Sequence, residues 1–167
     1  MIIGNPYKFA LTFDEVREWC CGSYDDNGHF AFCISGKMLP DHIINAIIGK
    51  ALVKILDKLK NAPEDSWLFS LDTSTAFERL YDRVYPTDND SDNDYRFELA
   101  PEEVIDAGYH VFLVKSDNAI RILGAYQDYD KEQSRHIFEG IEISETVIDE
   151  SQCDEITGRI EGCLKTM

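Results

Sequence analysis

The segment from Tyr109 to Gln127, YHVFLVKSDNAIRILGAYQ, constrains the fold most, because it can form two strands joined by a two-residue turn. Asp117 and Asn118 would make the turn, and both tolerate the positive φ that a type I′ turn requires. The predicted register pairs Tyr109, Val111, Leu113 and Lys115 with Tyr126, Gly124, Ile122 and Ile120 on one face, and His110, Phe112 and Val114 with Ala125, Leu123 and Arg121 on the other. Both faces are then largely apolar, which is typical of a central hairpin rather than an edge.

Arg121 is the one cation among these apolar neighbours. A guanidinium in such a position either extends its charged end to solvent or pairs with a carboxylate at the edge of the core. Both alternatives give Arg121 a structural role, so we assign no chemistry to the hairpin itself.

The composition indicates one domain with one sizeable core, since the chain has 167 residues of which 44% are hydrophobic. Its 32 acidic and 16 basic residues give a net charge of −16, which repels phosphates and argues against nucleic-acid binding. The same charge favours basic partners and aids solubility.

No apolar run reaches the ~20 residues of a membrane-spanning helix, and MIIGNPYKF lacks a signal-peptide pattern. We therefore expect no membrane partner and a cytoplasmic location.

Cysteine and histidine form no recognisable site in this sequence. The residues are Cys20, Cys21, Cys33, Cys153 and Cys163, with His29, His42, His110 and His136. The odd cysteine count argues against a closed disulfide framework, and no spacing fits zinc. His29 and Cys33 would lie about 13 Å apart along a strand, too far for proton transfer. Nucleophile elbow, P-loop, dinucleotide and metalloprotease motifs are absent. We predict no enzyme, no metal and no cofactor, with a cysteine-dependent enzyme as the least favoured alternative.

Hydrophobic periodicity predicts two strands and a helix in the first third of the chain. A strand lies within residues 7–19, and Phe30 to Ile34 form a second that pairs with it as a hairpin. Lys50 to Lys60 form an amphipathic helix. The preceding Ile43–Ile48 fits either the start of that helix or a separate strand.

The remaining segments complete an α+β pattern. Short strands are expected at Trp67–Leu71 and Tyr95–Leu99, and a longer strand is expected at Phe138–Ile148. A helix is expected after Thr75, which forms a capping box with Glu78, and its apolar stripe consists of Phe77, Leu80, Tyr81 and Val84. A brief helix is expected from Pro101 to Gly108, and a last helix begins at Ser151 with a stripe of Cys153, Ile156, Ile160 and Leu164. This order predicts a single domain, residues 1–167, with a mainly antiparallel sheet and about three to four helices packed on it.

The tract Asp88–Asp94, DNDSDND, is the only low-complexity segment. It fails the EF-hand test, because Asn93 stands where glycine is obligatory and Leu99 where the bidentate glutamate should be. A solvated acidic loop is the favoured interpretation, and an acidic metal-responsive domain is an alternative. We predict a partner-binding surface made of Asp88, Asp90, Asp92, Asp94, Glu102 and Glu103.

Several short segments together resemble the Immunity protein 42 family of bacterial polymorphic toxin systems. They are Ile3-Gly4-Asn5-Pro6-Tyr7 with Phe9, Trp19, Asn27-Gly28, Phe32, Gly36, Leu39-Pro40, Tyr85-Pro86, Tyr95-Arg96, Val111-Phe112 and Arg121-Ile122-Leu123. The DNDSDND tract and the Cys20-Cys21 pair are particular to this chain. The resemblance implies a cytosolic protein that binds and neutralises a cognate toxin, with no catalytic residues. Many such toxins are basic nucleases, which an acidic surface would match electrostatically. The sequence indicates neither the toxin's activity nor an oligomeric state.

Overall fold

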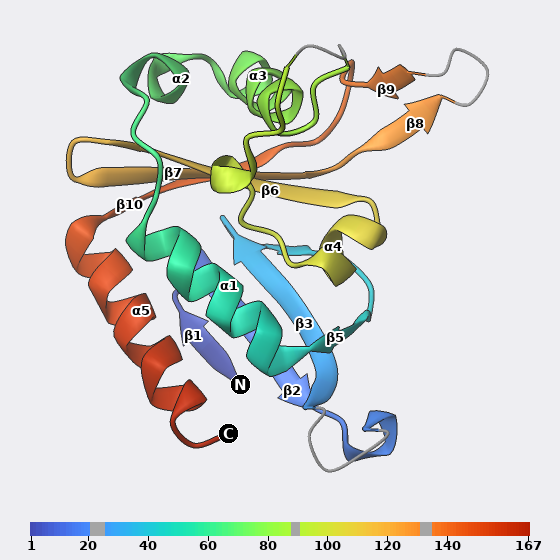
Figure 1. Cartoon of the computed structure of the whole chain (residues 1–167), viewed down its shortest axis with the longest axis vertical. Coiled ribbons are helices and arrows are strands. Elements are labelled where there is room, and N and C mark those ends of the chain that lie inside the picture. The colour runs from blue at the N-terminus through green and yellow to red at the C-terminus, as the bar shows by residue number, and fades with distance from the viewer. Residues whose placement is uncertain (21–25, 88–90, 131–134) are drawn as a thin grey trace.

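The computed structural model describes residues 1–20, 26–87, 91–130 and 135–167, and it has an α+β architecture built on antiparallel sheets (Figure 1). The first sheet has the order β1 (Ile2–Gly4), β2 (Phe9–Glu15), β3 (Asn27–Ile34) and β4 (Lys37–Leu39), and β5 (Asn45–Ile47) pairs with the other half of β3. The second sheet has the order β10 (Ser144–Asp149), β7 (Ala119–Tyr126), β6 (Tyr109–Ser116). A separate ribbon joins β8 (Asp128–Asp130) to β9 (Arg135–Ile137).

Five α-helices lie in the described part of the chain, two of them only five residues long. They are α1 (Ile48–Lys60), α2 (Ser66–Ser70), α3 (Thr73–Val84), α4 (Glu102–Asp106) and α5 (Glu150–Leu164), with 3₁₀ turns η1 (Arg17–Trp19) and η2 (Tyr95–Phe97). None of the helices in the described ranges is long and apolar enough to cross a membrane.

The central hairpin β6–β7 has the predicted register in every pair, from Tyr109 opposite Tyr126 to Ser116 opposite Ala119. The turn differs from the prediction, since only Asp117 has a positive φ, of 51°. Positive φ at the first turn residue alone is the sign pattern of a type II′ turn, which also suits the twist of a hairpin. The predicted partner of Arg121 is present at the core edge, where its Nε lies 2.8 Å from Glu145 Oε1.

The two larger sheets meet at Gly124 of β7. A Cβ at this position would lie 2.7 Å from Leu39 Cδ1 and 2.9 Å from Ile34 Cδ1, both in the first sheet. Glycine in a strand often marks such a close approach. The absence of a side chain here therefore lets β3 and β4 pack directly against the hairpin.

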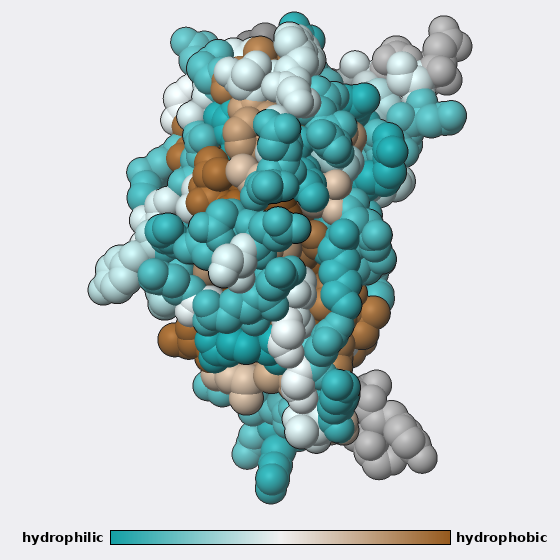
Figure 2. All heavy atoms as spheres, turned by 90° about the vertical axis from the view of Figure 1, so that its left-hand side faces the viewer, coloured by the Kyte–Doolittle hydropathy of each residue, from teal (hydrophilic) through white to brown (hydrophobic). Residues whose placement is uncertain are grey.

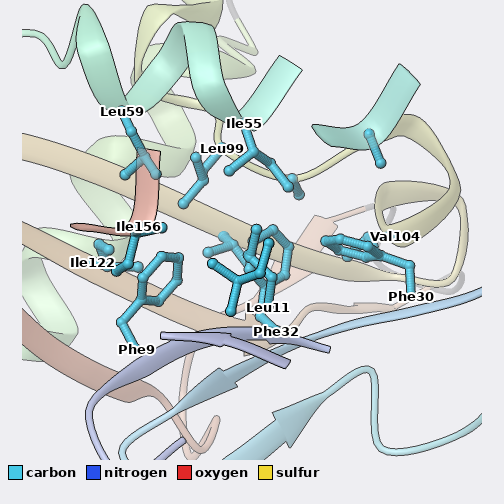
Figure 3. Close-up of a cluster of buried hydrophobic side chains, with 14 of the residues drawn as sticks. Phe9, Leu11, Phe30, Phe32, Ile55, Leu59, Leu99, Val104, Ile122 and Ile156 are labelled. Atoms are coloured by element: carbon cyan, nitrogen blue, oxygen red, sulfur yellow. The ribbon is translucent and has the colours of Figure 1, made fainter. Parts of the chain in front are cut away.

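The larger hydrophobic cluster, here called the main core, fills the space between the first sheet, α1, α5 and one face of β6–β7. Figure 3 shows Phe9, Leu11, Phe30 and Phe32 with Ile55 and Leu59 of α1, Ile122 of β7 and Ile156 of α5. The predicted stripes of α1 and α5 face this cluster, and Phe9, Phe30 and Phe32 are almost completely buried. Spacings of three and four residues on the helices and two on the strands bring these side chains to one interior.

A second core lies on the opposite face of β6–β7, under α2 and α3. It contains the predicted α3 stripe, Phe77, Leu80, Tyr81 and Val84, packed on Phe112, Val114 and Leu123. Figure 1 shows α2 and α3 on one side of the second sheet, with α1 and the first sheet on the other. The hairpin is thus covered on both faces, as its two apolar faces predict.

The open alternative at Ile43–Ile48 resolves into a strand followed by a helix. Residues 45–47 form β5, and α1 begins at Ile48. The first strand is shorter than predicted, since β2 begins at Phe9 while Tyr7 is 84% exposed.

Two predictions around α2 and α3 are wrong. Trp67–Leu71 is not a strand, because the Asp65 side chain accepts a hydrogen bond from Leu68 N at 3.0 Å and caps α2. Thr75 is not the cap of α3 either. Asp72 is the cap, and its side chain accepts from Thr75 N at 3.1 Å.

The predicted strand at Tyr95–Leu99 is also wrong, and the strand at Phe138–Ile148 is confirmed only from Ser144 onward. The first contains the 3₁₀ turn η2 and a single bridge between Glu98 and Phe112. In the second, Gly140 has a φ of 75°, and β10 begins only at Ser144. Within β10, Val147 is 45% exposed and Ile148 is buried.

Candidate partner-binding surface

The acidic tract is only partly described, because Asp88 and Asp90 lie outside the described residues. Asp92 is exposed. Asp94 forms ion pairs with Arg96 Nη2 at 2.8 Å and with Arg83 Nε at 3.7 Å, and the Arg96 guanidinium holds the pKa of Asp94 below its ordinary value. Asp94 also caps η2, so it has a structural role in addition to its charge.

The two predicted glutamates lie at the start of α4. Glu102 Oε2 is 2.8 Å from Lys50 Nζ, and this lysine lowers the pKa of Glu102. Glu103 accepts a hydrogen bond from Ile47 N at 3.4 Å. The structure therefore brings both glutamates to the β5–α1 junction and gives one of them a cationic partner.

Three lysines at four-residue spacing on α1 bind the segment that joins the tract to α4. Lys58 Nζ donates to Tyr95 O at 2.6 Å, Lys54 Nζ donates to Ala100 O, and Lys50 pairs with Glu102. Burial lowers the pKa of Lys54. Part of the negative charge predicted for this surface is thus balanced by α1. Within the described residues, no group of three or more His, Cys, Asp or Glu is placed to hold a metal ion.

A cavity of about 500 Å³ opens beside β4, where β6 begins and β7 ends. We call it the tyrosine groove and define it by Met38, Asp41, Tyr109, Tyr126, Asp128 and Glu142. These residues come from four segments that are separated in the sequence, which explains why periodicity alone did not identify the groove. The only sequence signal was the predicted pairing of two tyrosines across β6 and β7.

The tyrosines of the groove are held by specific contacts. Tyr109 Oη donates to Asp41 Oδ1 at 2.7 Å, and the two rings of Tyr109 and Tyr126 lie edge to face with centroids 5.2 Å apart. Burial, followed by the hydrogen bond to Asp41, raises the pKa of Tyr109, while that hydrogen bond lowers the pKa of Asp41. Gly108, with a φ of 85°, leaves room for Tyr126, since a Cβ there would lie 2.7 Å from Tyr126 Cε2. Tyr126 nevertheless remains 51% exposed.

The charge of the groove is negative. Asp41, Asp128 and Glu142 contribute three carboxylates, and Lys37, which also lines the cavity, forms an ion pair with Glu142. The opposite side of the molecule, over α5 and the β6–β7 turn, is mostly hydrophilic, with smaller apolar spots separated by polar side chains (Figure 2).

A buried polar cluster near α3 is closed to solvent and carries no accessible site. Glu98 is 1% exposed; it accepts from Tyr85 Oη at 2.9 Å and from Ala100 N at 3.2 Å, and His110 Nδ1 lies 3.5 Å from its carboxylate.

Burial raises the pKa of the Cys33 and Cys153 thiols. A nucleophilic cysteine needs the opposite shift, so neither thiol resembles a catalytic one.

Comparisons with known proteins agree over most of the chain. A family model described as Immunity protein 42 matches residues 1–161. A crystal structure of CdiI from Burkholderia dolosa AUO158 has a TM-score of 0.76 and 26% sequence identity, and the match covers 100% of both chains. No curated protein matches.

Proposed function

The chain belongs to the Immunity protein 42 family, and from this premise we propose that it neutralises a cognate toxin by stoichiometric binding, without catalysis of its own. The observation that carries the proposal is a family match over residues 1–161 together with a full-length structural match to an immunity protein. The raised pKa values of the Cys33 and Cys153 thiols argue against a thiolate nucleophile at these two positions. The cytoplasmic location expected from the sequence stays a prediction.

The partner we propose is a basic toxin domain. A net charge of −16 attracts a cationic surface over a distance of about a Debye length and accelerates encounter. In this proposal the toxin is steered by the predicted surface of Asp88, Asp90, Asp92, Asp94, Glu102 and Glu103. Asp94 and Glu102 contribute less to steering, since each already faces a cation.

The function is tested with the cognate toxin domain, which is sought first among the neighbouring genes. Co-expression should restore growth of cells that make the toxin, and the purified proteins should elute as a one-to-one complex. An equimolar amount of this chain that leaves the toxin fully active would overturn the proposal.

The steering role is tested by association kinetics across a salt series. Changing Asp88, Asp90 and Asp92 to asparagine should slow association several-fold at low salt and leave dissociation nearly unchanged. The difference should shrink as salt rises, because exposed charges are screened beyond about 8–10 Å. The matched control replaces three acids of α5, Glu150, Asp154 and Glu155, by their amides. Equal association rates for both variants at every salt concentration would show that the tract has no special part.

A further inference from the structure

We propose that the tyrosine groove anchors an arginine or lysine side chain presented by the toxin. This inference rests on the proposed function and goes further, because it names the surface that holds the partner once the two proteins have met. The groove lies at the end of the molecule where α4, β8 and the ends of β6 and β7 come together (Figure 1).

The groove has the size and the residue types of an anchoring pocket. Its volume of about 500 Å³ accommodates a long side chain with its neighbours. Tyr126 is 51% exposed and Met38 is 41% exposed, so a partner can bury apolar area on both. Tyrosine supplies large contact area with few rotatable bonds and is enriched at the few positions that dominate binding energy.

The charge of the groove decides the chemistry of the occupant. Asp41, Asp128 and Glu142 surround the two tyrosine rings, and Lys37 is held by Glu142. Asp41 receives both Tyr109 Oη and His42 Nδ1 on Oδ1, which leaves Oδ2 for N–H groups of a partner. A cation beside a tyrosine face gains from the ring quadrupole as well as from the carboxylates. An anionic or purely apolar side chain would gain neither.

The groove is also preorganised. The β6–β7 register places Tyr126 opposite Tyr109, the hydrogen bond to Asp41 fixes Tyr109, and Gly108 provides the space in which the Tyr126 ring lies. Gln127 N donates to Gly108 O at 2.8 Å, which fixes this corner to the end of α4. Rigid side chains lose less entropy on binding, so their contacts mostly slow dissociation.

The test compares two tyrosines of similar exposure in the complex with the cognate toxin domain. Tyr126 in the groove is 51% exposed, and Tyr95 beside the acidic tract is 55% exposed. Tyr126→Ala should speed dissociation about ten-fold or more, whereas Tyr95→Ala should leave it within about two-fold of wild type. Tyr126→Phe should bind like wild type, since it keeps the ring. Equal melting temperatures of the variants before binding confirm that each is folded.

The chemistry of the occupant is tested by double-mutant cycles. Tyr126→Ala and Asp41→Asn are each combined with replacement of exposed arginines and lysines of the toxin by methionine, and one such cation should show coupling to both. If Tyr126→Ala weakens the complex but none of these cations couples to Tyr126, the inference is overturned. A wild-type complex that Tyr126→Ala does not weaken overturns it while the proposed function stands, and a wild-type chain that binds no toxin overturns both.

Discussion

The two faces of the β6–β7 hairpin are equally buried but chemically different. On the main-core side, Val111, Leu113 and Ile122 meet aliphatic and phenylalanine side chains from the first sheet, α1 and α5. On the second-core side, the buried groups include Glu98, His110 and Arg121. The buried carboxylate, imidazole and guanidinium groups in the described part of the chain therefore all lie toward α2 and α3, whereas the buried Tyr109 and Cys153 belong to the main core.

The difference separates what stabilises the fold from what positions its parts. Apolar burial is non-directional and scales with area, so the main core supplies stability without demanding one orientation. A buried charge is tolerated only with well-placed partners. Arg121 Nη1 donates to Phe69 O at 2.8 Å and Leu71 O at 2.6 Å, so it fixes the end of α2 against the sheet.

The largest expected effect is the loss of a main-core side chain. Ile122→Ala should lower the free energy of unfolding by about 4 kcal/mol, and Leu123→Ala, its neighbour on the other face, by about 2–3 kcal/mol. Both side chains are fully buried, but Ile122 lies in the larger cluster between two sheets and two helices, whereas Leu123 lies in the smaller cluster. Urea denaturation measures both losses, and a greater loss for Leu123→Ala would reverse the comparison.

The next effect is the loss of Arg121. Arg121→Met should cost about 3 kcal/mol, because Glu145 and two carbonyl groups lose their partner. Adding Glu145→Gln should recover part of that loss, since no unpaired carboxylate then remains at the core edge. Arg121→Lys is the control for charge alone and should stay clearly below wild type, because lysine lacks the planar fork. If Arg121→Met has the same free energy of unfolding as wild type, the buried charge of the second core does not position α2 on the sheet.

The smallest effect appears only at alkaline pH. Burial first, with nearby Glu98, raises the pKa of Tyr81 to about 12. The unfolded chain therefore loses this proton near pH 10 while the folded chain keeps it. Stability should fall by about 1.4 kcal/mol per pH unit for this tyrosine between about pH 10 and 12. Tyr81→Phe should remove that part of the slope, leaving the part due to Tyr85, whose pKa is raised in the same direction.

Denaturation at several pH values between 9 and 12 checks this prediction. Tyr7→Phe, at a tyrosine that is 84% exposed, is the matched control and should keep the wild-type profile. If the free energy of unfolding falls with pH equally for Tyr81→Phe and wild type, Tyr81 is not kept neutral in the second core.

Sequence reasoning succeeded on the main core and on the α3 stripe, and it failed on the short segments over the second core for one physical reason. The main-core segments have regular apolar spacing, so the β6–β7 register and the stripes of α1 and α5 could be predicted. The segments over the second core are set by individual polar contacts, such as Asp65 capping α2 and Asp94 capping η2. Such contacts depend on tertiary placement, and β-branched or aromatic composition at Trp67–Leu71 and Tyr95–Leu99 pointed to strands instead.

The candidate site follows the same division. The sequence showed that acidic residues cluster at Asp88–Asp94, but it could not show that Asp94 and Glu102 face cations. The tyrosine groove joins β4, the ends of β6 and β7, and Glu142, so no local pattern contains it. Its two tyrosines were predicted to be opposite each other, and only the folded structure shows that one side of that pair is open.

The contact between β1 and α5 has a consequence for how the protein is made. Arg159 Nη2 donates to Ile2 O at 2.7 Å across 157 residues, and α5 also covers α1. A ribosome adding about 5–20 residues per second needs roughly 8–30 s to pass from the first of these elements to the last. During this interval the inner faces of β1 and α1 have no cover from α5. The main core of a newly made molecule is therefore complete only when α5 has emerged and docked.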